Sequence, residues 1–139
     1  MPLAQVTFGL LDTLEHFPSI FFAKLVQRCG GWPIPFLVPQ KDVDGESWTS
    51  QDEYNKVRGF RKSESGEETM LEYSNRVSSM MRVFFHVLKI RPMQKPLDQM
   101  FQLPRYWTWF ARLLGDPKLL ADPIAPQLIY SKLFILLVL

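Results

Sequence analysis

The segment from Tyr106 to Gly115, with the sequence YWTWFARLLG, constrains the fold more than any other part of the chain. Trp107 and Trp109 are two positions apart, and an α-helix turns by about 200° between such positions, so the two rings cannot share one narrow stripe. This spacing predicts a helix packed on more than one side, as in stacked helical arrays. Pro104 suits the start of this helix and Gly115 suits its end.

The first apolar pattern of the chain predicts an amphipathic helix over residues 3–15. Its expected apolar face is formed by Leu3, Val6, Leu10 and Leu14, widened by Phe8 and Leu11. A second helix is expected from Pro18 to about Arg28, because proline suits the first turn of a helix and the Gly30-Gly31 pair suits its end.

A proline-rich loop and a short helix are expected next. Residues 30–48 contain Pro33, Pro35 and Pro39 together with acidic residues, and no helical period survives there. Ser50 and Glu53 have the spacing of a capping box, which predicts a short helix that Gly59 terminates. Residues 62–68 are polar.

The longest apolar repeat begins at Met70 and predicts a long helix closed by Pro92 and Pro96. Its apolar arc is broad and comprises Tyr73, Val77, Met80, Met81, Phe84, Phe85, Val87 and Leu88. Such an arc belongs at the centre of the packing. Asp122 is then expected to cap a last helix, with Pro123 at its first position. We find no alternating strand of useful length, so we predict an all-α fold of antiparallel helix pairs.

Size and composition indicate one modest globular domain. The chain has 139 residues, 47% of them hydrophobic, and a formal net charge of +2, which is too small to imply nucleic-acid binding by the whole chain. A single cysteine, Cys29, excludes an internal disulfide and fits a reducing compartment. The longest apolar run, Leu133 to Leu139, is too short to span a bilayer, so no transmembrane segment is expected.

Basic residues dominate one stretch, in which Asp98 is the single acidic residue. They are Arg76, Arg82, Lys89, Arg91, Lys95, Arg105 and Arg112. Such a stretch fits a phosphorylated ligand or an acidic partner, and equally a solvated helical face. Interleaved aromatic and basic residues can bind RNA, but these aromatics fall on expected apolar faces. Core packing is therefore favoured, and no direct specific nucleic-acid binding is expected.

The sequence contains no recognisable catalytic constellation, so we predict that the chain is not an enzyme. Phosphate-cradling and dinucleotide-binding glycine patterns are absent from the sequence. Cys29 could pair with His16 or His86 as nucleophile and base, but a cysteine at the end of an apolar helix is more often buried and structural. Two histidines and one cysteine at wide spacing supply too few strong ligands for a metal site.

Several blocks of the sequence, in order along the chain, resemble one known family. They are Pro2–Val6, Phe17–Leu25 with Arg28-Cys29, Pro35-Phe36 with Asp52–Tyr54 and Gly59-Phe60, Ser78–Val83, and the tryptophan segment. These blocks are similar to the nuclear-pore mRNA export factor family called Gle-one (GLFG-lethal protein). The resemblance implies a partial C-terminal domain over residues 1–130, built as a HEAT-like helical array truncated at both ends. Residues 131–139 are then expected to be a divergent hydrophobic tail.

The same resemblance implies a function and a ligand site. Members of the family are expected to activate a DEAD-box RNA helicase without being enzymes, with inositol hexakisphosphate bridging the two proteins during poly(A) mRNA export. Gln27-Arg28 corresponds to the family's Lys-Lys before its cysteine, so Arg28 keeps a charge that Gln27 loses. Other nucleoporins and translation factors are further expected partners, at the cytoplasmic face of the nuclear pore, in the nucleus and the cytoplasm. The alternative is an inactive scaffold fragment that retains contacts with pore proteins only.

Overall fold

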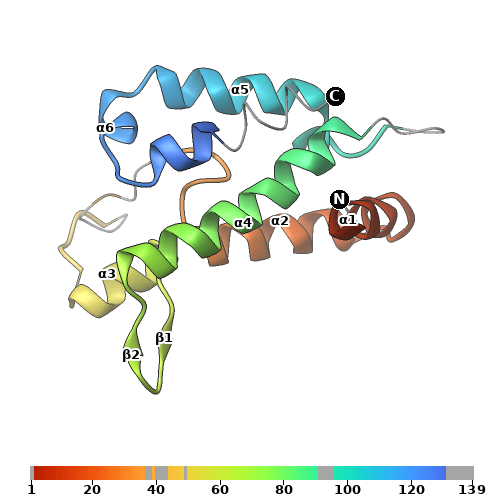
Figure 1. Cartoon of the computed structure of the whole chain (residues 1–139). Helices are drawn as coiled ribbons and strands as arrows, with labels where there is room; N and C mark the ends of the chain where they lie inside the picture. Colours follow the sequence, from red (N-terminus) through yellow and green to blue (C-terminus); the bar gives the residue numbers. More distant parts are fainter. Residues whose placement is uncertain (1, 37–38, 40–43, 49, 91–95, 131–139) are drawn as a thin grey trace.

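The computed structural model describes residues 2–36, 39, 44–48, 50–90 and 96–130, and within them the chain is mostly helical (Figure 1). The elements in chain order are α1 (Pro2–Thr13), α2 (Phe17–Cys29), α3 (Gln51–Val57), strands β1 (Lys62–Ser63) and β2 (Gly66–Glu67), α4 (Met70–Lys89), the 3-10 helix η1 (Gln99–Phe101), α5 (Leu103–Leu114) and α6 (Pro117–Leu120). Residues 125–130 are also helical. The all-α prediction is confirmed, whereas the HEAT-like arrangement stays a prediction.

The long helix α4 runs through the middle of the molecule, as its broad apolar arc predicts (Figure 1). It contacts α1, α2 and α5. A capping box that the sequence analysis did not identify begins the helix: Thr69 Oγ1 accepts from the Glu72 N–H at 3.2 Å, and Glu72 Oε2 accepts from the Thr69 N–H at 2.9 Å. Phe84 and Phe85 are fully buried near its C-terminal end, so α4 supplies the centre of the core.

Aromatic side chains join α4 to the helices on either side. The ring of Phe84 lies 6.2 Å from that of Phe22 on α2, and Phe85 meets Trp109 of α5 edge-on at 4.8 Å. Trp109 Nε1 in turn donates to the backbone carbonyl of Trp32 at 2.6 Å, within the buried core. This hydrogen bond fastens the proline-rich loop to α5 and satisfies a buried indole N–H.

The tryptophan helix α5 is not packed on more than one side, so that prediction is wrong. Trp109 is 1% exposed, but Trp107 is 52% exposed. Tyr106, Trp109 and Leu113 follow the helical period and form one buried face. Trp107 lies away from that face and contacts the ring of Tyr106 edge-on at 5.3 Å. The helix is therefore amphipathic, with an aromatic residue on its outer side.

Helix α1 forms as predicted but buries a different face. Leu3 is 59% and Val6 60% exposed, whereas Ala4, Thr7 and Leu11 are buried. Small side chains at Ala4 and Thr7 let α1 approach the core closely, and Thr7 Oγ1 is satisfied by donating to the Leu3 carbonyl at 2.8 Å. The expected apolar face of α1 thus points largely to the solvent.

Most helices begin and end close to the positions that capping residues, prolines and glycines predicted. Ser50 Oγ accepts from the Glu53 N–H at 3.1 Å at the start of α3. Asp122 Oδ1 accepts from the Ile124 N–H at 3.1 Å, just before helical residues 125–130. A short helix begun by Asp116 and Pro117 was missed. Pro92 and residues 131–139 lie outside the described residues, so the predicted division at residue 130 stays a prediction.

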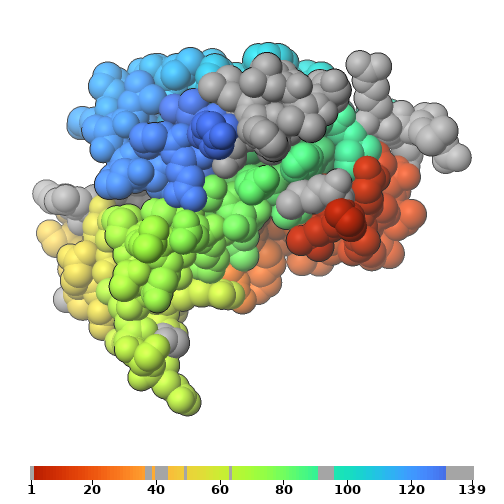
Figure 2. All heavy atoms as spheres, viewed as in Figure 1, coloured from red at the N-terminus to blue at the C-terminus, as the bar shows by residue number. Residues whose placement is uncertain are grey.

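The polar segment after α3 forms an antiparallel hairpin in which Lys62 pairs with Glu67 and Ser63 with Gly66. Figure 2 shows this hairpin projecting from the body of the molecule. None of the helices in the described part of the chain is long and apolar enough to cross a membrane.

Two glycines bring the C-terminal ends of α2 and α3 together. Gly30 has a φ of 65° and Gly59 a φ of 92°, both in the left-handed region. A Cβ atom on Gly30 would lie 2.3 Å from the Arg58 carbonyl oxygen, and one on Gly59 would lie 2.8 Å from the Gly30 nitrogen. Only glycine at both positions allows the two backbones to approach so closely.

This contact predicts a large effect of Gly30→Ala on stability. Gly45→Ala is the matched control, because Gly45 also has a positive φ, of 83°, but its Cβ would meet nothing within 4 Å. We expect Gly45→Ala to lower the free energy of unfolding by about 1 kcal/mol, from backbone strain alone. Gly30→Ala should cost about 3 kcal/mol or more, because a steric clash adds to the strain. Equal losses in urea unfolding would contradict the close approach.

Candidate anion-binding site

The two residues predicted to bind a polyphosphate lie in the last turn of α2. Gln27 and Arg28 are both exposed. Arg28 suits this place because the C-terminal end of a helix carries a partial negative charge that stabilises a cation. One turn earlier, Lys24 Nζ donates to Gln27 Oε1 at 3.2 Å, so Gln27 holds a second cation on the same helix.

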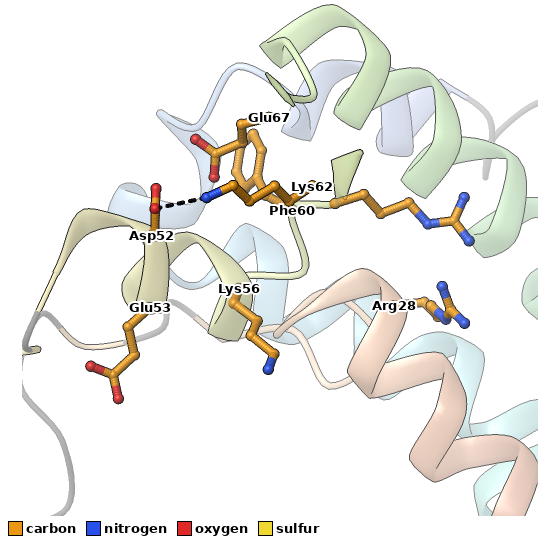
Figure 3. Close-up of a pocket in the computed structure, with 8 residues that line it drawn as sticks. Arg28, Asp52, Glu53, Lys56, Phe60, Lys62 and Glu67 are labelled. Atoms are coloured by element: carbon orange, nitrogen blue, oxygen red, sulfur yellow. Dashed lines mark hydrogen bonds and ion pairs between the residues drawn. The ribbon is translucent and has the colours of Figure 1, made fainter. Parts of the chain in front are cut away.

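Arg28 lines an open cleft between the end of α2, helix α3 and the hairpin, with a volume of about 900 Å³ (Figure 3). Its other lining residues are Asp52, Glu53, Lys56, Phe60, Arg61, Lys62 and Glu67. An adjoining hollow of about 630 Å³ is lined by Gln27 and Arg28 together with Lys56 and Arg61. The structure therefore brings both predicted residues together with two cations that the sequence analysis did not single out.

Charge is distributed unevenly across this cleft. Lys62 Nζ lies 3.1 Å from Asp52 Oδ2, and Figure 3 shows this pair on the side away from Arg28. Within the described ranges, no ion pair joins Arg28, Lys56 or Arg61 to a carboxylate. In the hollow beside Arg28, three cations (Arg28, Lys56 and Arg61) line the wall with one carboxylate, Glu53, so an anion would meet more positive than negative charge there.

A single side chain, Arg76 of α4, holds the walls of the cleft together. Its Nη2 donates to Glu68 Oε1 at 2.6 Å and to the Gly59 carbonyl at 2.5 Å, and its Nη1 donates to the Arg28 carbonyl at 2.7 Å. Its Nε also donates to Glu68 Oε2 at 3.2 Å. We call this set of contacts the Arg76 junction. Arg76 and Glu68 are 13% and 12% exposed, so water screens the junction little.

Stacked rings and a guanidinium form the wall behind the cations. Phe60 stacks on Tyr73 of α4 with centroids 3.9 Å apart and planes 5° apart. The Arg58 guanidinium lies 4.9 Å from the centroid of Phe60 and 4.6 Å from that of Tyr54. Tyr73 donates its hydroxyl hydrogen to the Arg58 carbonyl at 2.9 Å. Arg58 is thus used for internal packing, whereas Arg61 lines the cleft.

The basic stretch noted in the sequence serves several internal contacts. Arg76 forms the junction, Arg112 donates to the Ile34 carbonyl at 3.0 Å, and Arg105 lies 6.0 Å from the ring centroid of Phe22. Arg91 and Lys95 lie outside the described residues. The cations that line the cleft come from earlier in the chain, from α2, α3 and the start of the hairpin.

Cys29 is buried and does not present a reactive thiol. Cys29 is 0% exposed, its Sγ lies 3.7 Å from Met80 Sδ, and burial raises its pKa to about 12. A thiol in this state is inert, which confirms the buried structural cysteine. Burial also lowers the pKa of His86. No group of metal-ligating side chains occurs among the residues that the structure describes.

Comparisons with known proteins point to one family. A family profile described as GLE1-like protein matches residues 1–136. The mRNA export factor GLE1 of Danio rerio is 25% identical over 116 residues, which make up 82% of this chain and 16% of that protein.

Two solved structures have the same fold. Both are described as an S. cerevisiae Dbp5 C-terminal domain bound to Gle1 and IP6, the second with a substituted Gle1. The TM-scores are 0.75 and 0.74 at 18% and 19% identity, and the likeness covers 95% of this chain and 43% of the matched chain. At such identities the likeness establishes the fold alone.

The Arg76 junction predicts a loss of stability in acid. Burial alone would raise the pKa of Glu68, but hydrogen bonds from Arg76 and from the Arg61 N–H outweigh it, so the pKa lies below its ordinary value of 4.5. A carboxylate with a lowered folded-state pKa stabilises the protein above its unfolded-state pKa, and this contribution is lost as the pH falls through the folded value.

We therefore expect Glu68→Gln to lower the free energy of unfolding near neutral pH by about 2 kcal/mol. Between about pH 5 and pH 3 the variant should lose less further stability than the wild type. Glu64→Gln, at an exposed position in the same hairpin, is the control and should keep the wild-type profile. Parallel urea-unfolding profiles for wild type and Glu68→Gln would refute the role of this ion pair.

Proposed function

Because the chain belongs to the GLE1-like protein family, we propose that it acts in mRNA export as a polyphosphate-dependent partner of a DEAD-box RNA helicase. The observation that carries this proposal is the group of Arg28, Lys56 and Arg61 around one cleft. The matched structures are described as containing Dbp5 and IP6, which supports the choice of helicase and ligand. The chain spans 16% of the curated relative, so the activity is proposed for this part of such a protein.

The cleft suits a densely charged anion better than a singly charged one. Arg28 and Lys56 both lie in the last turns of helices, where the helix dipole opposes an anion. Binding must therefore come from the side chains themselves, through charge-assisted hydrogen bonds. Inositol hexakisphosphate, with phosphates all around its ring, can contact several cations at once and still present phosphates to a second protein.

A bridging polyphosphate explains how the chain can act without catalysing a reaction. The anion neutralises the repulsion between two basic surfaces and binds both of them. The two proteins can therefore associate even though their own surfaces are not complementary in charge. When the anion holds the helicase domain against this chain, that domain shifts toward one of its conformations. This shift promotes the ATP cycle of the helicase. The proposal includes action at the cytoplasmic face of the nuclear pore, with other nucleoporins and translation factors as further partners.

A second candidate is favoured by the same cleft. Gln27 carries no charge where the family has a lysine, and Asp52, Glu53 and Glu67 also line the cleft. These features weaken the attraction for an anion. In this reading the chain is an inactive scaffold that keeps contacts with pore proteins but binds no polyphosphate.

Calorimetric titration with inositol hexakisphosphate at two salt concentrations distinguishes the candidates. We expect salt-sensitive binding that Arg28→Ala weakens by about 10-fold to 100-fold, as loss of a charge-assisted hydrogen bond requires. Gln27→Lys should tighten it several-fold by restoring a cation. Arg82→Ala, at an exposed α4 position outside the cleft lining, is the control and should bind like the wild type.

An ATPase assay with the helicase and RNA then tests activation. Stimulation should require both the chain and the polyphosphate, and should fall with Arg28→Ala in step with binding. Polyphosphate binding without stimulation would restrict the role to bridging. A folded chain that binds no polyphosphate would overturn the proposal and leave the scaffold candidate.

A further inference from the structure

The cleft beside Arg28 contains a further cation, Lys62, that already has a partner. Lys62 Nζ lies 3.1 Å from Asp52 Oδ2, and Figure 3 shows the two side chains meeting on the side of the cleft away from Arg28. The two side chains are 69% and 67% exposed. Such a pair is weak, because water screens the attraction between its charges, so a more highly charged anion can separate it.

The local structure explains why Lys62 pairs with Asp52. Asp52 lies in the first turn of α3, which Ser50 caps, and Lys62 begins strand β1. Lys62 is also opposite Glu67 in the hairpin, so these two side chains lie on the same face. The carboxylate of Glu67, however, accepts a hydrogen bond from Asn55 Nδ2 at 3.0 Å. Lys62 forms its ion pair across the cleft with Asp52 instead.

We propose that the pair of Lys62 and Asp52 is an electrostatic latch that a polyphosphate must open before it can bind Lys62. This inference rests on the proposed function, because it concerns the regulation of the same site. In the closed latch the two charges cancel, so a ligand is attracted by Arg28, Lys56 and Arg61 alone. In the open latch, Lys62 donates to a phosphate oxygen and the carboxylate of Asp52 is left without its cation.

The latch makes the cleft selective for ligands with several phosphates. A ligand with a single phosphate group uses it on the cations near Arg28 and has none left for Lys62. A polyphosphate has further phosphates, and lysine can follow them because its ammonium sits on a flexible four-carbon stem. A charge-assisted hydrogen bond to phosphate exceeds the attraction within an exposed ion pair, so the ligand opens the latch. Asp52 therefore reduces the gain from Lys62 without abolishing it.

The latch also shortens the time for which the ligand stays bound. Differences in affinity between related complexes lie mostly in the dissociation rate, so a site weakened by Asp52 releases its ligand faster. A polyphosphate that bridges the chain to a helicase must be released when the two proteins separate. Asp52 assists this release, because it recaptures Lys62 as a phosphate leaves.

Calorimetric titration of the 139-residue chain with inositol hexakisphosphate at low salt tests the latch. Asp52→Asn should tighten binding by about 5-fold to 10-fold, because it frees Lys62 and removes a carboxylate from the cleft. Glu67→Gln is the matched control: it removes the same charge from the same cleft, keeps an acceptor for Asn55 and frees no cation. It should tighten binding by only about 2-fold. Circular dichroism melts establish that each variant is folded.

A double-mutant cycle shows whether the ligand takes Lys62 from Asp52. Lys62→Gln should weaken binding by about 2-fold in the wild type but by about 10-fold in the Asp52→Asn background, where no latch opposes the contact. An equal effect in the two backgrounds overturns the latch, as does equal tightening by Asp52→Asn and Glu67→Gln.

These outcomes are distinct from failure of the proposed function. In both of them the wild type still binds the polyphosphate, so the proposed function stands without the latch. Absence of binding by the wild type and by every variant overturns the proposed function and the latch together. Binding by Asp52→Asn but not by the wild type supports the latch, because the cleft then binds only when Lys62 is free.

Discussion

The largely buried ion pair between Arg76 and Glu68 is the interaction on which the rest of this structure depends. One planar guanidinium binds the carboxylate and also the carbonyls of Arg28 and Gly59, which belong to segments far apart in the sequence. Lysine could not replace it, because an ammonium lacks the fork that makes these bonds at once. Removing the two charges from water costs free energy, and the hydrogen bonds that Arg76 and Glu68 form offset this cost. Gly30 and Gly59 can then touch, and the cleft forms beside them.

Local signals in the sequence were sufficient to predict the longer helices, although they missed α6 and the 3-10 helix η1. Ser50 and Asp122 cap helices where their side chains suggested, and Gly30 ends α2. The faces that those helices bury were harder to predict. Periodicity shows that a segment is a helix with an apolar side, but not which neighbour that side meets. For this reason the prediction was wrong for Trp107 and for the face of α1 that contains Leu3 and Val6, all of which are exposed.

The candidate site was predictable only in part, for a related reason. Arg28 was identified through its place beside Cys29 in a family motif. No local sequence pattern distinguishes Lys56 and Arg61, because single basic residues are common at the end of a short helix and before a hairpin. They line the cleft with Arg28 because the Arg76 junction spans a separation of 48 residues between Arg28 and Arg76. A long-range constraint of this kind leaves no periodic signal in the sequence.

The measurement that tests this account most directly is amide hydrogen exchange with and without inositol hexakisphosphate. The cleft predicts slower exchange in residues 26–31 and 55–62 together, because the ligand bridges two segments that the Arg76 junction already couples. In Arg76→Met the two segments should lose this shared protection while helix α5 exchanges as before. Protection confined to residues 103–114, or none near Arg28, would contradict the account and place the ligand elsewhere.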